Sequence, residues 1–210
     1  GNGQKQLAEV VAGLETASNG QVYLDGKLST QQSPSQRIEN GLSYIPEERM
    51  YDGVVKEFSV AENLILQDHI WAPFSNGIFL AFKHITEHAD KMIRNFRIKT
   101  PTQDTLIKNL SGGNIQKVIM ARELARKPRV LIAAQPTRGV DIGAIEYIHE
   151  QLLFQRGEGL ATLLIAEDLD EVRNLSDRIA VMFSGEIMGI VDNAETTVEE
   201  LGLMMAGERG

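Results

Sequence analysis

Short apolar runs alternate with helical stretches in the second half of the chain. Val130–Ala134 and Ala161–Ala166 carry no charge, and each is followed by polar residues or proline. Such runs are typical of strands that are buried on both faces of a parallel sheet. Between them, Gly143–Arg156 places apolar residues at helical spacing. The three segments predict a βαβ unit, which should have a right-handed crossover.

The segments that follow predict a helix and a hairpin. Asp168–Leu175 places its apolar residues on one helical face. Arg178–Phe183 and Glu186–Val191 flank the pair Ser184-Gly185. Two strand-like runs separated by a two-residue turn of this type are typical of a β-hairpin.

The first half of the chain combines helical and strand patterns. Apolar residues at Leu7, Val10, Val11 and Leu14 form one predicted helical stripe, so the chain begins at the head of a helix. Val22–Leu24 predicts a strand that runs into a turn. The stretch 57–97 has a helical pattern interrupted at Pro73 and at Asn76-Gly77, which indicates a helical insertion between two pieces of an α/β core.

Composition narrows the possible classes of function. The 210 residues suffice for one α/β domain, and a net charge of −8 argues against nucleic acid as the main partner. The absence of cysteine excludes disulfides and cysteine-ligated metal. No apolar run is long enough to span a membrane, so any work there would need a membrane-spanning partner. The four histidines fit no metal spacing: His69, His84, His88 and His149.

The strongest candidate for chemistry is LSGGNIQK at Leu110–Lys117. Ser111 suits the N-cap of a helix whose buried stripe begins at Ile115. The two glycines let another backbone approach, while amide N–H groups and the positive helix end stay exposed. This predicts a site for a terminal phosphate. The alternative is a Ser-Gly-Gly turn that only starts a helix, and these residues alone leave both interpretations open.

Several motifs in order resemble those of ABC-type ATPases. LSGGNIQK resembles the family's signature motif, and the apolar run at Val130 followed by AAQPTRGVD resembles its Walker B strand and D-loop, which ends at Asp141. Residues 44–49 occupy the place of the Q-loop, and residues 166–168 occupy that of the switch segment. The resemblance extends along nearly the whole chain.

The resemblance implies a P-loop NTPase (RecA-like) α/β fold, with a parallel-sheet core and an inserted α-helical subdomain. The expected domain covers residues 1–207, with the core at 1–54 and 127–207, the helical and signature subdomain at 55–126 and a tail at 208–210. In the family an antiparallel β-subdomain and a central strand precede the P-loop. We expect both to be absent here, because the chain opens midway through that loop.

The resemblance implies ATP as the ligand, with Mg²⁺. The family's P-loop has the form GxxxxGK[ST], in which the lysine and the hydroxyl serve phosphate and magnesium. Here Gln4 stands in place of the lysine and Lys5 in place of the hydroxyl residue. The predicted ATP-binding residues are Gly1, Asn2, Gly3, Gln4, Lys5, Gln6 and Glu47, the last standing where the Q-loop has glutamine.

At three further positions, residues that serve ATP hydrolysis in the family are replaced in this chain. Ala134 replaces the aspartate that orders magnesium, Gln135 replaces the glutamate that polarises water, and Glu167 replaces a histidine near the γ-phosphate. By itself Ala134 is an ordinary residue for the end of a buried strand, and its meaning comes from what it displaces. General-base catalysis contributes roughly 10²–10⁴-fold. We therefore expect no intact catalytic residue in cis, and Mg²⁺ mainly at a partner's site.

The signature is intact, and in this family it faces ATP that is held by a second nucleotide-binding domain. The residues predicted to do so are Leu110, Ser111, Gly112, Gly113, Asn114 and Gln116. The second domain would be tandem or a separate chain. The other implied partners are transmembrane permease subunits and, indirectly, a substrate-binding protein, which places the domain at the cytoplasmic face of the plasma membrane.

The PTRGVD form and the ending at 197–207 resemble the second, degenerate half of importers for simple sugars or nucleosides. The AAQPT variant favours a nucleoside slightly. Two alternatives stay open. Hydrolysis could persist with Lys5, Glu47 and Glu48 as substitutes, or the chain could be a non-transport ABC protein, against which the acidic balance counts.

Overall fold

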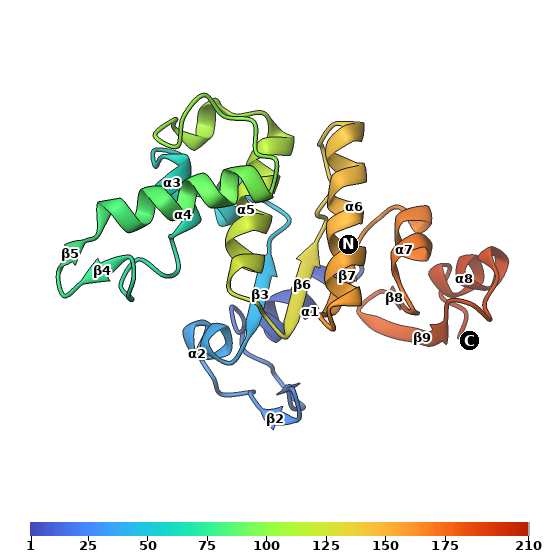
Figure 1. The fold of residues 1–210 in the computed structure, drawn as a ribbon. Coiled ribbons are helices and arrows are strands. Elements are labelled where there is room, and N and C mark those ends of the chain that lie inside the picture. The colour runs from blue at the N-terminus through green and yellow to red at the C-terminus, as the bar shows by residue number, and fades with distance from the viewer. Residues whose placement is uncertain (210) are drawn as a thin grey trace. The chain divides into compact units, whose positions relative to one another are not determined.

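The computed structural model describes residues 1–209, which form two compact units (Figure 1). We call the first the sheet unit, made of 1–44, 129–135 and the chain from 152 onward. The second is the helical unit, made of 45–128 and 136–151. Within residues 1–209, no helix has the length and apolar character that crossing a membrane requires.

The sheet unit holds a parallel pair of strands at its centre. Its elements are α1 (Gln4–Ala12), β1 (Tyr23–Leu24), β2 (Lys27–Leu28), α2 (Pro34–Glu39), β3 (Leu42–Ile45), β6 (Val130–Ala134), β7 (Ala161–Ile165), α7 (Leu169–Leu175), β8 (Arg178–Phe183), β9 (Glu186–Asp192) and α8 (Val198–Met205). The strands β3, β6 and β7 are neighbours in that order. Since β6 and β7 pair in parallel, from Val130 opposite Ala161 to Ala134 opposite Ile165, this part of the βαβ prediction is confirmed.

The helix α1 packs through alanines, which the predicted stripe did not include. Ala8 and Ala12 are buried in a cluster with Ile132 of β6. The prediction that Leu14 belongs to the helical stripe is wrong, because α1 ends at Ala12 and the side chain of Leu14 is 54% exposed. The reason is local: Gly13 takes a left-handed conformation (φ 82°) that ends the helix two residues before Leu14.

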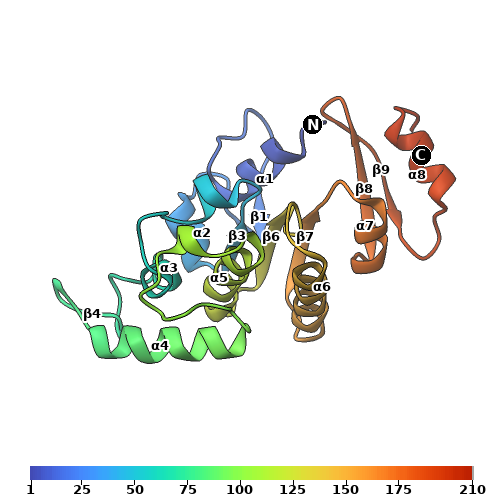
Figure 2. The ribbon, with the colours of Figure 1, turned by 90° about the horizontal axis from the view of Figure 1, so that it is seen from above.

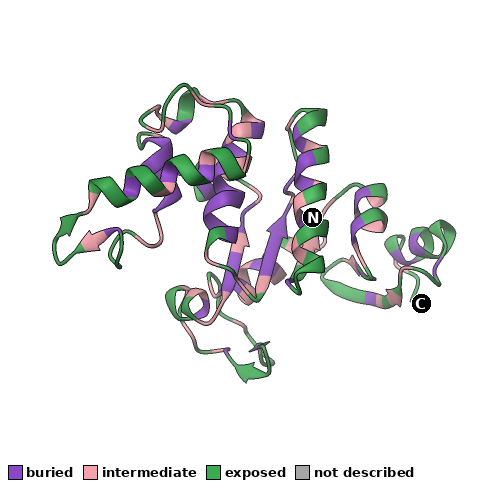
Figure 3. Cartoon of the chain, viewed as in Figure 1, coloured by how far each residue is buried: buried purple, intermediate pink, exposed green. Residues whose placement is uncertain are grey.

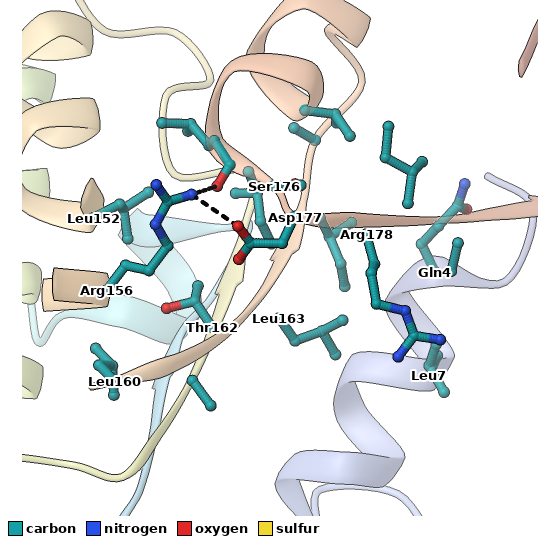
Figure 4. A pocket seen from close by; sticks show the side chains of 18 of the residues that line it. Gln4, Leu7, Leu152, Arg156, Leu160, Thr162, Leu163, Ser176, Asp177 and Arg178 are labelled. Atoms are coloured by element: carbon teal, nitrogen blue, oxygen red, sulfur yellow. Dashed lines mark hydrogen bonds and ion pairs between the residues drawn. The ribbon is translucent and has the colours of Figure 1, made fainter. Parts of the chain in front are cut away.

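The strand β7 differs from the prediction of burial on both faces. β6 is almost wholly buried (Figure 3). Ala161 and Thr162 of β7, by contrast, are exposed. Among the described strands β7 pairs only with β6. A cavity of about 590 Å³ follows its other edge, lined by the consecutive residues 160–166, by residues of β8 and by Gln4 and Leu7 of α1 (Figure 4). An edge without a neighbouring strand explains the exposure.

The hairpin β8–β9 carries α7 and α8 beside it (Figure 2). Its turn residues Ser184 and Gly185 both have positive φ (49° and 85°), as the predicted two-residue turn requires. The apolar side of the hairpin, with Ile179 and Val181, packs on Leu201 and Met204 of α8. The predicted helix and hairpin are confirmed here.

The helical unit is built around one long buried helix. Its elements are the π-helical turn η1 (Arg49–Gly53), α3 (Val60–Leu64), β4 (Ser75–Asn76), β5 (Phe79–Leu80), α4 (Phe82–Asn95), the 3-10 turn η2 (Ile107–Asn109) and α5 (Gly112–Ala125). The helix α6 (Ile142–Gly157) begins in this unit. The predicted helical insertion holds for α3 and α4, but its interruption forms the small hairpin β4–β5. Ile115, Val118 and Ile119 of α5 are buried, as predicted.

The boundaries of the units differ from those expected at 55–126. The helical unit begins at Ile45 and also takes in 136–151. The reason is that this second segment packs on α5, where Gly113 lies against Asp141 and Ala144. Of the predicted tail, Gly210 lies outside the described residues.

Candidate functional site

The N-terminus of α5 leaves its polar groups available to a ligand. Ser111 is the N-cap, with extended backbone angles (φ −65°, ψ 155°). Its carbonyl oxygen accepts the first helical hydrogen bond, from Ile115 N at 3.0 Å. Its hydroxyl makes no bond to the backbone N–H groups of the first turn. These groups carry the positive end of the helix dipole, so the arrangement favours an anion.

Gly113 permits a close approach between α5 and the start of α6. A Cβ atom placed on Gly113 would lie 2.8 Å from Ala144 Cβ and 2.9 Å from Asp141 Oδ2. The other carboxylate oxygen of Asp141 accepts from Ala144 N at 3.0 Å. The same loop approaches Gly112, whose Cβ position lies 3.4 Å from Gly139 O. Gly113 is therefore needed for this packing, whereas a Cβ at Gly112 would make an ordinary van der Waals contact, and Asp141 faces the signature helix.

Charged residues join two loops of the helical unit. Arg49 donates to the carbonyl oxygens of Arg138 and, at 3.2 Å, of Gly139. Arg138 in turn forms ion pairs with Glu47 and, at 3.7 Å, with Glu48. Burial lowers the pKa of Arg49, and the charge of Glu48 opposes that shift. Glu47, a predicted ATP-binding residue, is thus engaged with an arginine of the following loop.

Gln116 is placed differently from the other predicted signature residues. Its side chain is 1% exposed, and its Nε2 has no hydrogen-bond partner among the described residues. Ser111 is exposed, while Leu110 and Asn114 are partly exposed. In this conformation Gln116 does not reach the surface, so a contact with a nucleotide would require its side chain to move.

A cationic cluster that the sequence did not reveal lies beside the signature. The Lys117 ammonium is 4.5 Å, and the Arg97 guanidinium carbon 5.7 Å, from the ring centre of Tyr147. Burial lowers the pKa of Lys117, and the positive charge of Lys99 lowers it further. Burial raises the pKa of Tyr147 to about 12. No local pattern could find this cluster, because its members Arg97, Lys117 and Tyr147 are far apart in the sequence.

The predicted phosphate loop belongs to the sheet unit. Gly3 has φ 101° and precedes α1. Gln4, in place of the lysine, turns its Oε1 back to accept from Asn2 N at 2.7 Å. The Asn2 carbonyl oxygen accepts from Gly185 N at 3.0 Å, which ties the loop to the β8–β9 turn. The ammonium of Lys5 lies 3.7 Å from Glu9, one helical turn further along.

The three replaced positions end strands or precede helices in the same unit. Ala134 is 4% exposed at the end of β6. Gln135 follows with a positive φ of 51°, and its N–H donates to Ile165 O at 2.7 Å. Glu167 is exposed and precedes Asp168, whose carboxylate caps α7. Among residues 1–209, no group of three acidic, histidine or cysteine side chains is placed to hold a metal ion.

Residues 1–138 match the ABC transporter family. The chain belongs to this family. It is 44% identical to the nucleoside import ATP-binding protein of Lactococcus lactis and 44% identical to the guanosine import ATP-binding protein of Bacillus subtilis. Each match covers 99% of the chain and 41% of the relative. The ribose import ATP-binding protein of Oceanobacillus iheyensis is 38% identical over 100% of the chain and 42% of its own length.

Solved cassettes of the family share the fold. An ATP-binding cassette in its ADP conformation superposes with a TM-score of 0.73 at 25% identity, covering 98% of this chain and 80% of that one. A nucleotide-free cassette superposes with a TM-score of 0.73 at 26% identity, and the match again covers 98% of this chain and 80% of that one. The mixed α/β architecture with a parallel sheet is therefore that of a P-loop NTPase, and the family is that of the transporter ATPases. The chain spans about two fifths of the length of the curated relatives.

Proposed function

We propose that this domain binds ATP as the energy-coupling part of an import system for a nucleoside or a simple sugar. In this proposal its signature completes the ATP site of a second nucleotide-binding domain. The observation that carries it is the N-terminus of α5, where the Ser111 hydroxyl and the first-turn amides form no cap with each other. The relatives named for nucleoside, guanosine and ribose import support the substrate class.

In its own pocket the domain hydrolyses ATP poorly. Ala134 offers no ligand to magnesium, and Gln135 cannot act as a general base. Gln4 is bonded to the loop backbone and Lys5 pairs with Glu9, which argues against substitution of the lysine by either. Glu47 is likewise paired with Arg138. Magnesium would then serve mainly the partner's site.

The remaining partners follow from this role. Permease subunits would carry the substrate across the membrane, with a substrate-binding protein delivering it, and the domain would lie at the cytoplasmic face against the permease. The second nucleotide-binding domain would be tandem or a separate chain. A nucleoside is favoured over a sugar by the AAQPT segment at 133–137.

Mutations in the assembled transporter test the division of labour between the two sites. Ser111→Arg or Gly112→Asp places bulk or negative charge at the anion-binding helix end. We expect either to abolish transport-coupled ATP hydrolysis, because the partner's ATP loses its second contact surface. Gln135→Ala should leave turnover within about twofold of wild type, because position 135 supplies no base. Equal loss from Ser111→Arg and Gln135→Ala would contradict the proposal.

A further inference from the structure

The N-cap of α5 differs in chemistry from three other caps of the chain. At Ser33, Ser59 and Thr197 the cap hydroxyl accepts from the backbone N–H of the third helical residue. In each case the side chain of that residue reaches back and accepts from the N–H of the cap. Each of these helix ends therefore satisfies its own groups, as capping boxes do.

At α5 the third helical residue is Asn114, and its side chain bonds the cap hydroxyl instead. Asn114 Nδ2 donates to Ser111 Oγ at 2.9 Å. The Ser111 hydroxyl makes no bond to the backbone of the first turn. The side chain at the third helical position thus accepts a hydrogen bond in the other three helices, whereas in α5 it donates one to the cap hydroxyl.

The orientation of the Asn114 amide is fixed by a second contact. Its Oδ1 accepts from the backbone N–H of Lys99 at 2.7 Å. A flipped amide would place its NH₂ group against that N–H, and two donors would face each other. The NH₂ group must therefore be the end that contacts Ser111.

This contact determines what the Ser111 hydroxyl can do. A hydroxyl has one hydrogen to donate and two lone pairs to accept with. One lone pair of the Ser111 hydroxyl accepts the hydrogen from Asn114 Nδ2. The hydroxyl cannot donate its own hydrogen to that NH₂ group, because the NH₂ group is itself a donor. That hydrogen is left for an acceptor outside the helix, beside the first-turn amides that a phosphate would meet.

We propose that Asn114 is a positioning residue that acts through Ser111. It holds the hydroxyl as a donor toward the terminal phosphate of a nucleotide on the second domain. The proposal rests on the proposed function, since it assumes that the signature faces such a nucleotide. It assigns Asn114 a role through Ser111 rather than a contact of its own with ATP.

A double-mutant cycle in the intact transporter tests this. Asn114→Ala, Ser111→Ala and the double variant are compared for kcat and KM of ATP hydrolysis. We expect Asn114→Ala to lower kcat about five- to tenfold, the value of one oriented hydrogen bond, with KM little changed. In the Ser111→Ala background the same substitution should change kcat less than about twofold.

The controls separate positioning from folding. Asn95→Ala removes an exposed amide at the end of α4 and should leave kcat unchanged. Melting temperatures of all variants report on the fold, and Asn114→Ser serves as a second truncation that is too short to reach Ser111. An equal loss from Asn114→Ala in both backgrounds, or no loss from Asn114→Ala in the otherwise wild-type protein, would overturn the role of Asn114. If Ser111→Ala itself has no effect, it is the proposed function of the signature that fails.

Discussion

Gly113 shows how a single missing side chain brings two functional segments together. An added Cβ would meet Ala144 and Asp141 at under 3 Å, the second of these being the predicted D-loop residue. Gly113→Ala should therefore lower the free energy of unfolding by about 1–3 kcal/mol through overpacking, despite the better helix propensity of alanine. We also expect reduced ATP hydrolysis in the transporter, because the D-loop must shift. Urea denaturation and steady-state turnover measure the two effects.

Gly202→Ala in α8 is the matched control for Gly113→Ala. A Cβ at Gly202 meets no atom within 4 Å. Since it only improves helix propensity, it should raise the free energy of unfolding by about 0.5–1 kcal/mol. Equal effects of the two substitutions would mean that the contact at Gly113 is not a constraint.

Tyr147 leads to a prediction of how the stability of the fold depends on pH. Its hydroxyl is buried and has no hydrogen-bond partner among the described residues, and burial raises its pKa to about 12. A folded pKa above the unfolded value of about 10 stabilises the fold below pH 10, and this contribution is lost as pH rises toward 12. Tyr147→Phe should remove that alkaline loss and keep or slightly raise stability at pH 7. Melting temperatures from pH 8 to 11.5 test it, and parallel curves for both proteins would contradict it.

At the scale of elements, α2 is fixed to α1 by one buried arginine. Arg37 is 2% exposed, and its guanidinium donates to the carbonyl oxygens of Val10, Val11 and Thr30 at 2.6, 2.7 and 3.1 Å. Arg37→Met keeps much of the volume but leaves these acceptors without a partner. We expect the free energy of unfolding to fall by about 2–4 kcal/mol. Arg94→Met, an exposed site on α4, should change it by less than about 0.5 kcal/mol.

Elements with strong local signals could be predicted from the sequence, whereas those that depend on neighbours could not. The apolar run of β6 and the turn pair Ser184-Gly185 determine their structure locally, and both predictions are confirmed. Burial of β7 depends on what lies along its second edge, which its own residues do not encode. The same holds in the candidate site: the cap role of Ser111 is local, but the burial of Gln116 and the pairing of Glu47 with Arg138 arise from distant segments.

For the whole molecule, we predict that the edge of β7 that pairs with no described strand limits the stability of the 210-residue chain. The cavity along this edge is lined by apolar side chains such as Leu163 and Ile179, and β7 pairs only with β6 among the described strands. Partly exposed apolar strands lower stability and bind hydrophobic dyes.

We therefore expect the 210-residue chain to melt broadly below about 50 °C, to enhance the fluorescence of an apolar dye, and to bind ATP weakly. The control is the same chain extended at Gly1 by a designed segment that can pair along the free edge of β7. If an added segment pairs with β7, the longer protein should melt more sharply and at a higher temperature, because the strand gains a hydrogen-bonded neighbour and the cavity is filled. A sharp transition of the 210-residue chain well above about 50 °C, without dye binding, would show that this edge does not limit its stability.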